Sequence, residues 1–263
     1  MTIVKRFTMT AILACGTAFA AQAATLPADW TVVGNAGIGG ANGVVTAPSA
    51  TDSGYYYVST FGGPQGGGQL PGLGGTNGST VTTGAFAAAA GDALEFLFNY
   101  VTSDGAGYAD YGWARVIDAV SNSQVALLFT ARTTPGGDTV PGFGMPQPEA
   151  TMVPADTPII PGGPVWDVLG SDSGNCYDLG CGYTGWIKST YQFQNDGLYQ
   201  LQFGVSNWSD TSWHSGMAFS GAIVGNVVIT PPVDPSPVPL PASALLLAGG
   251  VAAMGALRRR RGA

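Results

Sequence analysis

The sequence predicts an all-β protein: an antiparallel β-sandwich of jelly-roll type, with an N-terminal signal helix and a single C-terminal transmembrane helix outside the sandwich. Glycine supplies 41 of the 263 residues, and 10% of the residues are aromatic while 10% are charged. This composition disfavours long helices and favours strands joined by tight turns. Residues 94–100 and 199–205 place apolar side chains at every second position, which is typical of strands with one buried face.

The remaining elements follow from apolar stretches separated by turn residues. Segment 62–78 is so rich in glycine that we expect a surface loop that does not pack. Seven prolines between Pro141 and Pro164 predict a long excursion across the surface, because proline removes donors from a strand ladder. The predicted strands are 55–60, then a meander of 94–100, 111–118 and 125–131, then a hairpin of 191–194 and 198–205 about Asn195-Asp196-Gly197, and finally 216–220 and 222–229.

The N-terminus has the pattern of a secretory signal peptide. Lys5 and Arg6 precede an apolar stretch at residues 9–20, and Ala21-Gln22-Ala23 is a small-residue cleavage site. We expect cleavage after Ala23, with Ala24 as the alternative, so the general secretion machinery and signal peptidase are the predicted partners. A lipoprotein signal ending at Cys15 is the competing interpretation; its apolar stretch is short and Leu13 is unusual at its position.

The C-terminal segment, residues 231–263, combines three features. A short proline-rich stretch is followed by residues 240–257, which are 18 residues without a charge. At 1.5 Å per residue they predict a helix of about 27 Å, enough to cross the hydrocarbon core of a bilayer. A cluster of arginines then holds that end on the cytoplasmic side. The chain therefore divides into residues 1–23, a sandwich at 24–230, and a linker with membrane helix at 231–263. The arginines of the cluster are Arg258, Arg259, Arg260 and Arg261.

This tail resembles the sorting signal of the PEP-CTERM family, in the variant that reads Val-Pro-Leu-Pro-Ala. The resemblance implies an exosortase as partner, a membrane-embedded transpeptidase that recognises the motif and removes the tail. It also implies transient residence in the inner membrane, followed by the cell envelope, outer surface or extracellular matrix. An ordinary anchor that is never processed is the alternative. The motif residues are Val238, Pro239, Leu240, Pro241 and Ala242.

The body resembles the lectin-like, or choice-of-anchor, sandwich domains of PEP-CTERM proteins. Segments 99–105 and 107–111 carry the likeness, together with 207–210 and 215–219. In relatives the last motif often reads Asp-Ser-Gly-Leu-Ala-Phe/Ile-Asp. His214 and Ser220 stand here where the two aspartates are expected, which weakens the case for a metal.

The charge of the exported part restricts its partners. Without residues 1–23 and the tail from Val238 onward, Arg115, Arg132 and Lys188 face 16 acidic residues, a formal charge of −13. A domain this acidic repels phosphate backbones, so we expect no nucleic acid partner. Divalent cations remain plausible ligands.

Two cysteines remain after the signal peptide is removed. Cys176 and Cys181 form a pair in an oxidising compartment, which predicts one disulfide closing a small loop. Half of a metal site is the rival interpretation, but the body contains no second cysteine pair and His214 is the only histidine.

Three kinds of chemistry remain open for the body. Asp104, Asp110 and Asp210 lie in predicted turns, where carboxylates can converge on calcium; no cofactor is expected otherwise. The tryptophans Trp186, Trp208 and Trp213 lie among loop residues, where aromatic faces would suit sugar rings. Both patterns also have ordinary explanations, since aspartate is a common turn residue and tryptophan is usually buried.

Catalysis is not expected. A serine-nucleophile triad would have to use His214, and no Gly-x-Ser-x-Gly elbow is present. The only glutamates are Glu95 and Glu149, in a predicted strand and in the proline-rich excursion. We therefore predict an exported cell-surface or exopolysaccharide-associated protein that is processed by an exosortase and is not an enzyme. A carbohydrate-binding module, assisted by calcium in one version, and a secreted hydrolase are the alternatives.

Overall fold

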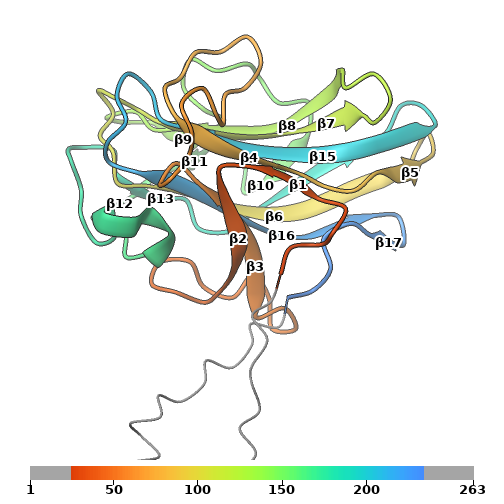
Figure 1. Ribbon diagram of the computed structural model, residues 1–263, viewed down its shortest axis with the longest axis horizontal. Helices are drawn as coiled ribbons and strands as arrows, with labels where there is room; N and C mark the ends of the chain where they lie inside the picture. The colour runs from red at the N-terminus through yellow and green to blue at the C-terminus, as the bar shows by residue number, and fades with distance from the viewer. Residues whose placement is uncertain (1–24, 234–263) are drawn as a thin grey trace, which may run out of the picture. The chain divides into compact units, whose positions relative to one another are not determined.

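The computed structural model describes residues 25–233, which form two β-sheets packed face to face (Figure 1). Every strand pair in these residues is antiparallel. The helical content of the described residues is one 3₁₀ segment, η1 (Asp167–Asp172). The predicted all-β sandwich is confirmed.

The first sheet contains long strands from the middle and the later part of the chain. Its spatial order is β1 (Thr31–Val33), β4 (Gly78–Thr82), β15 (Gly197–Ser206), β7 (Tyr111–Asp118) and β8 (Gln124–Arg132), with β5 (Phe86–Ala88) also pairing with β15.

The second sheet is built around a long central pair of strands. Its order is β10 (Thr151–Val153), β14 (Ile187–Gln192), β6 (Ala93–Thr102), β16 (Ser215–Val224), β3 (Gly54–Ser59) and β2 (Asn35–Gly40). Three short strands extend it: β13 (Gly182–Tyr183) pairs with β6 and with β12 (Ile160–Pro161), and β17 (Val227–Val228) pairs with β16. A separate pair joins β9 (Asp138–Val140) to β11 (Thr157–Pro158).

Stacked aromatic rings fill the space between the two sheets. Phe98 of β6 stacks on Phe129 of β8 with ring centroids 3.7 Å apart. Phe203 of β15 stacks on Phe219 of β16 at 3.9 Å. All four side chains are fully buried. The period-two pattern therefore marked Phe98 and Phe203 correctly as core-facing, because each belongs to the inward set of its strand.

Two predicted strand pairings are wrong. Strand β6 lies in one sheet, whereas β7 and β8 pair in the other. Of the predicted meander, only the pairing of β7 with β8 is present. Likewise β14 and β15 lie in opposite sheets, although Asn195-Asp196-Gly197 does turn the chain between them. A turn motif alone cannot tell a hairpin from a crossing between sheets.

The glycine-rich segment 62–78 packs against the sandwich, contrary to expectation. Gly68 and Leu70 are buried, and the Gly68 carbonyl accepts a hydrogen bond of 2.8 Å from Trp113 Nε1. Leu70 lies in a small apolar cluster with Trp113. Glycines here allow close approach of backbone to backbone rather than flexibility.

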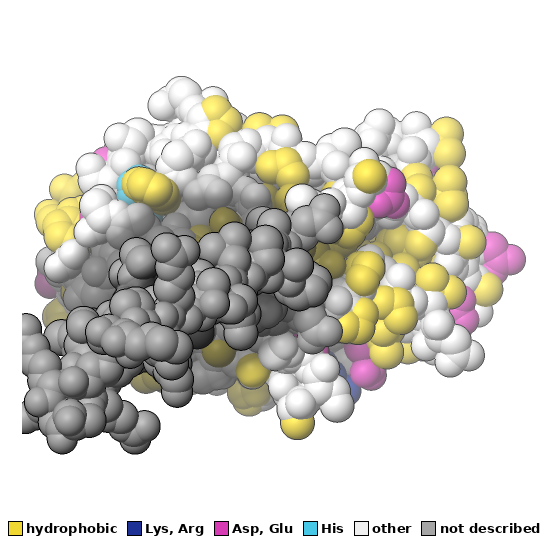
Figure 2. Space-filling view, turned by 60° about the horizontal axis from the view of Figure 1, so that its bottom comes forward, with side chains coloured by type: hydrophobic (Ala, Val, Ile, Leu, Met, Phe, Trp, Pro, Cys, Tyr) yellow, Lys and Arg dark blue, Asp and Glu magenta, His cyan; other side chains and the backbone are white. Residues whose placement is uncertain are grey.

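The two ends of the described chain meet at the start of β3. A groove beside them is lined by Leu26, Ile38, Tyr56 and Val233 among others. The Tyr56 hydroxyl donates to the Pro231 carbonyl at 3.0 Å. Hydrophobic side chains also gather on the face shown in Figure 2.

Several predicted features lie outside residues 25–233: the cleavage positions Ala23 and Ala24, the motif at 238–242 and the arginines at 258–261. Within residues 25–233 we find no helix with the length and apolar character needed to cross a membrane.

Candidate functional site

A cluster of buried polar side chains occupies one end of the sandwich, where β6 and β15 end and β16 begins. The strand register brings them together, since Ser215 lies opposite Thr102 and Ser206 opposite Tyr111. We call this cluster the polar end; its fully buried members are Thr60, Thr102, Ser103, Asp104, Asp110, Ser206, Asn207 and Ser215.

The carboxyl group of Asp110 is the most densely bonded member. Its Oδ1 accepts a hydrogen bond from the Trp208 backbone N–H at 2.9 Å. Its Oδ2 accepts one from the Ser215 hydroxyl at 2.6 Å, and Ser215 also hydrogen-bonds with the Thr102 hydroxyl at 2.7 Å. Burial, followed by the neighbouring charge of Asp104, raises the pKa of Asp110 well above its ordinary value.

Asp104 is less well satisfied. Its Oδ1 accepts the Gly105 N–H at 2.7 Å, while its Oδ2 is buried without a hydrogen-bond donor. Burial raises the pKa of Asp104 to about 7, and the charges of Asp210 and Asp172 act in the same direction. The structure thus brings together two of the three predicted calcium ligands, Asp104 and Asp110.

The third predicted ligand, Asp210, lies at the edge of this cluster. Its Oδ1 accepts the Ser212 N–H at 2.9 Å, as an aspartate in a turn commonly does. Its charge nevertheless raises the pKa of both buried aspartates. No group of three or more histidine, cysteine, aspartate or glutamate side chains within residues 25–233 has metal-binding geometry. Any cation here would need neutral oxygens as well.

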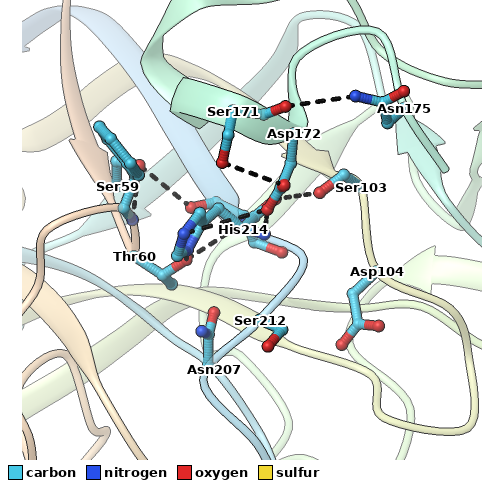
Figure 3. Close-up of polar contacts among 12 residues, drawn as sticks. Ser59, Thr60, Ser103, Asp104, Ser171, Asp172, Asn175, Asn207, Ser212 and His214 are labelled. Atoms are coloured by element: carbon cyan, nitrogen blue, oxygen red, sulfur yellow. Dashed lines mark hydrogen bonds and ion pairs between the residues drawn. The ribbon is translucent and has the colours of Figure 1, made fainter. Parts of the chain in front are cut away.

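His214 is held by neighbours on both sides (Figure 3). Its Nδ1 lies 3.2 Å from the Thr60 hydroxyl, and its Nε2 lies 3.9 Å from Asp172 Oδ2. The same Asp172 oxygen accepts the His214 backbone N–H at 2.8 Å. Burial lowers the pKa of His214. Thr60, His214 and Asp172 thus follow the order of a nucleophile, a base and an orienting carboxylate.

The environment of Thr60 favours a structural role for this set. Thr60 is fully buried, and its hydroxyl already accepts the Ser215 N–H at 3.0 Å. A nucleophile must reach its substrate. The two glutamates are also occupied: Glu95 pairs with Lys188 at 3.3 Å, and Glu149 accepts the Leu127 N–H at 3.3 Å. The geometry therefore offers little support for hydrolysis.

Three aromatic side chains form a row on the loops around the polar end. The ring of Tyr177 lies 5.7 Å from that of Tyr108 and 5.5 Å from that of Trp213. Tyr108 and Tyr177 are 41% and 47% exposed, which leaves much of both rings in contact with solvent. Trp213 adopts a left-handed backbone conformation, with φ of 56°. We call these three residues the aromatic row.

The predicted disulfide is confirmed, and it carries the central ring of the row. Cys176 and Cys181 are bonded, with their Cα atoms 5.7 Å apart. The Tyr177 N–H donates to the Ser103 carbonyl at 2.9 Å, which ties the disulfide loop to the turn that holds Asp104. The disulfide loop therefore holds Tyr177 beside the polar end.

Of the three predicted binding tryptophans, only Trp213 belongs to the row. Trp186 packs against Tyr55 at 6.0 Å, and its Nε1 donates to the Thr46 carbonyl. Trp208 packs against Arg132, whose guanidinium carbon lies 4.4 Å from the centroid of the Trp208 ring. Tyr108 and Tyr177 were not predicted. The Cys176–Cys181 pair was the available signal for Tyr177, since it fixes a tyrosine on a short surface loop.

Fold and site together define a two-sheet antiparallel sandwich with a polar end bordered by exposed aromatic rings. No protein-family model matches the chain, and no curated protein matches it by sequence. The solved structures that resemble it include two at low identity. The first is the K1 cleaved adhesin domain of Lys-gingipain from Porphyromonas gingivalis W83, with 13% identity, 77% of this chain and 93% of that chain covered, and a TM-score of 0.37.

The second is the enzymatically active domain of tailspike protein 4 from bacteriophage CBA120. It is 11% identical, with a TM-score of 0.34, and the match covers 76% of this chain and 20% of that chain. Scores this low leave the function to be argued from the residues themselves.

Proposed function

We propose that this chain is an exported, surface-displayed protein without catalytic activity, whose polar end and aromatic row bind carbohydrate. The aromatic row carries the proposal. Exposed aromatic faces stack on the apolar faces of sugar rings, and adjacent polar groups then fix the orientation of the sugar. Asp210, at the edge of the polar end, provides a carboxylate near Trp213 of the row, and Asp178 provides one beside Tyr177.

A jelly-roll topology is part of the same proposal. Its support is the order β3-β16-β6-β14 in one sheet and β4-β15-β7-β8 in the other. In chain order these eight strands cross between the sheets as two Greek keys do. Such sandwiches leave their end loops free to vary, which suits recognition.

Glycan binding should depend on the aromatic row. Trp213→Ala and Tyr177→Ala in the full chain are each expected to weaken binding to bacterial polysaccharides about tenfold or more, because a central aromatic anchor contributes at least ~1.4 kcal/mol. A glycan array identifies the ligand, and titration calorimetry measures the affinity.

Phe143→Ala is the matched control, since Phe143 is an aromatic residue outside the row and is 67% exposed. Its affinity should equal that of the wild type. Equal binding by all three variants, or no binding of the wild type to any glycan, would exclude the aromatic row as the site.

The tail motif supports the part of the proposal that concerns export and surface display. The signal peptide would direct the chain through the inner membrane, the helix at 240–257 would hold it there, and an exosortase would act at Val238–Ala242. The mature protein would then reside in the cell envelope, on the outer surface or in the extracellular matrix.

Mass spectrometry of the protein from its native host tests this directly. We expect a mature chain that begins at or just after Ala24 and lacks the arginine cluster. Deleting residues 238–242 should leave the arginine-ended form in the inner membrane. A native chain with both ends intact in a soluble fraction would contradict export and sorting together.

A further inference from the structure

The electrostatics of the polar end are unbalanced. Asp104 and Asp110 are fully buried, and hydrogen bonds through Ser215 and Thr102 link the Asp110 carboxyl group to the Asp104 backbone N–H. Two ionised carboxylates both accept hydrogen bonds and neither donates one, so they repel in this position. A buried charge is normally paired, neutralised by a proton or bound to a metal ion.

In the part of the chain that the structure describes, no cationic side chain forms an ion pair with Asp104 or Asp110. Arg132 donates through Nε to the Ala109 carbonyl at 3.0 Å and lies over the Trp208 ring. The acidic partner of His214 is Asp172: His214 Nε2 lies 3.9 Å from Asp172 Oδ2. Among residues 25–233 the only other ion pair is Lys188 with Glu95.

A second buried oxygen points to the same need. Asn207 is fully buried, and its Oδ1 has no hydrogen-bond donor. The amide orientation is set by its other atom: Asn207 Nδ2 donates to Asn77 Oδ1 at 3.1 Å, while Asn77 Nδ2 donates to the Thr60 carbonyl at 3.3 Å. Asn207 Oδ1 is therefore the atom of this amide that lacks a hydrogen-bond partner.

Figure 3 shows Asp104 and Asn207 on either side of Ser212. Asn207 is also covalently next to Trp208, whose N–H bonds Asp110. Asp104, Asp110 and Asn207 thus all belong to the polar end, and Asp104 and Asn207 each carry an unsatisfied buried oxygen.

We propose that the polar end binds one hard divalent cation, of the calcium class, through Asp104, Asp110 and Asn207. Calcium prefers carboxylate and carbonyl oxygens and tolerates irregular geometry, whereas magnesium demands a near-ideal octahedron. Backbone carbonyls and water would complete its six to eight ligands. The cation would join the β6–β7 loop, which carries Tyr108, to the β15–β16 loop, which carries Trp213. Its binding is measurable without any glycan.

Titrating the full chain with CaCl₂ after chelation tests the site. Calorimetry should show one calcium per chain, with weaker binding of magnesium. For a dissociation constant of about 0.1–1 mM, typical of extracellular modules, 10 mM calcium should raise the melting temperature by about 3–10 °C. Absence of both effects in the wild type overturns the proposal.

Three variants assign the ligands. Asp104→Asn keeps the shape of the side chain and should weaken calcium binding at least about tenfold. Asn207→Asp adds a carboxylate and should strengthen it, an outcome that a purely structural asparagine would not give. Asp138→Asn is the control, because Asp138 is exposed on β9, and its affinity should equal that of the wild type. An unchanged affinity in Asp104→Asn would refute the assignment.

A shared proton is the competing explanation, and pH separates the two. The folded pKa of Asp104, about 7, exceeds its unfolded value, so the folded state holds the proton more tightly and loses stability as pH rises toward 7. In chelator, the wild type should therefore melt at a lower temperature at pH 8 than at pH 5, relative to Asp104→Asn. The comparison with Asp104→Asn removes the opposite contribution of His214, whose pKa is lowered, and those of Asp172, Asp210 and Arg132, which are common to both proteins. Because the charge of Asp104 also raises the pKa of Asp110, the difference reports the two buried carboxyl groups together.

Calcium at pH 8 should restore the lost melting temperature. If it does not, the proton alone explains the pair and the cation site is excluded. Glycan binding by Trp213→Ala is measured separately, so failure of either proposal is recognised without the other.

Discussion

Replacing Phe219 by alanine is expected to destabilise the protein by about 3–5 kcal/mol. Phe219 is fully buried at the centre of the sandwich, stacked on Phe203 at 3.9 Å and next to Tyr56 at 5.7 Å. The substitution removes the contacts that join β16 to β15 across the two sheets and leaves a cavity that rigid strands cannot close. Because a domain of this size has a total stability of about 5–15 kcal/mol, the loss is a large fraction.

Chemical denaturation of the full chain measures this change. Thermal denaturation should show a fall in the melting temperature of about 6–20 °C. Phe143→Ala makes the same chemical change at a side chain that is 67% exposed, and should leave stability within about 0.5 kcal/mol of the wild type. A loss at Phe219 no greater than that at Phe143 would mean that the core is not packed as described.

Gly68→Ala is expected to cost about 4 kcal/mol or more. Gly68 has a φ of 75°, a left-handed conformation that costs a residue with a Cβ about 1–2 kcal/mol. A Cβ at this position would also lie 1.8 Å from the Val205 carbonyl oxygen. The backbone has to move, and its movement displaces the Gly68 carbonyl from Trp113 Nε1.

Gly66 supplies a matched control two residues earlier. It has the same φ of 75°, but a Cβ there would meet nothing within 4 Å. Gly66→Ala should therefore show the conformational cost alone, about 1–2 kcal/mol. Urea denaturation of both variants isolates the steric part as their difference. Equal losses would show that Gly68 does not pack against Val205.

The long strands β3, β6, β7, β8, β15 and β16 could be located from the sequence, whereas β4 and most of β14 were missed. The partners of the strands could not be predicted. Alternation in residues 94–100 follows directly from one buried face, which is a local property. Whether β6 pairs with β7 or lies in the opposite sheet depends on residues far away in sequence, such as Ser215 opposite Thr102. The glycines at 62–78 misled for a related reason. Their composition suggests flexibility, while their function is to allow close approach to Val205 and Trp113.

The candidate site could be predicted only in part. Trp213, Asp104 and Asp110 were identified because their residue types suit sugars or cations in turns. Asp104 and Asp110 are six positions apart, so local chain geometry brings them together. Tyr108 and Tyr177 were missed because their proximity depends on how the disulfide loop docks on the Ser103 carbonyl. That contact leaves no mark on composition or periodicity.

The position of the two chain ends has a consequence for display at the cell surface. Val233 contacts Gly54 at the start of β3, while Ser59 and Thr60, at the other end of this strand, border the polar end. Six residues of strand separate the two, about 20 Å. A protein tethered through its C-terminus would therefore point its aromatic row outward, with the tether and the ligand at opposite poles. Removal of the tail would free the domain without disturbing a bound polymer.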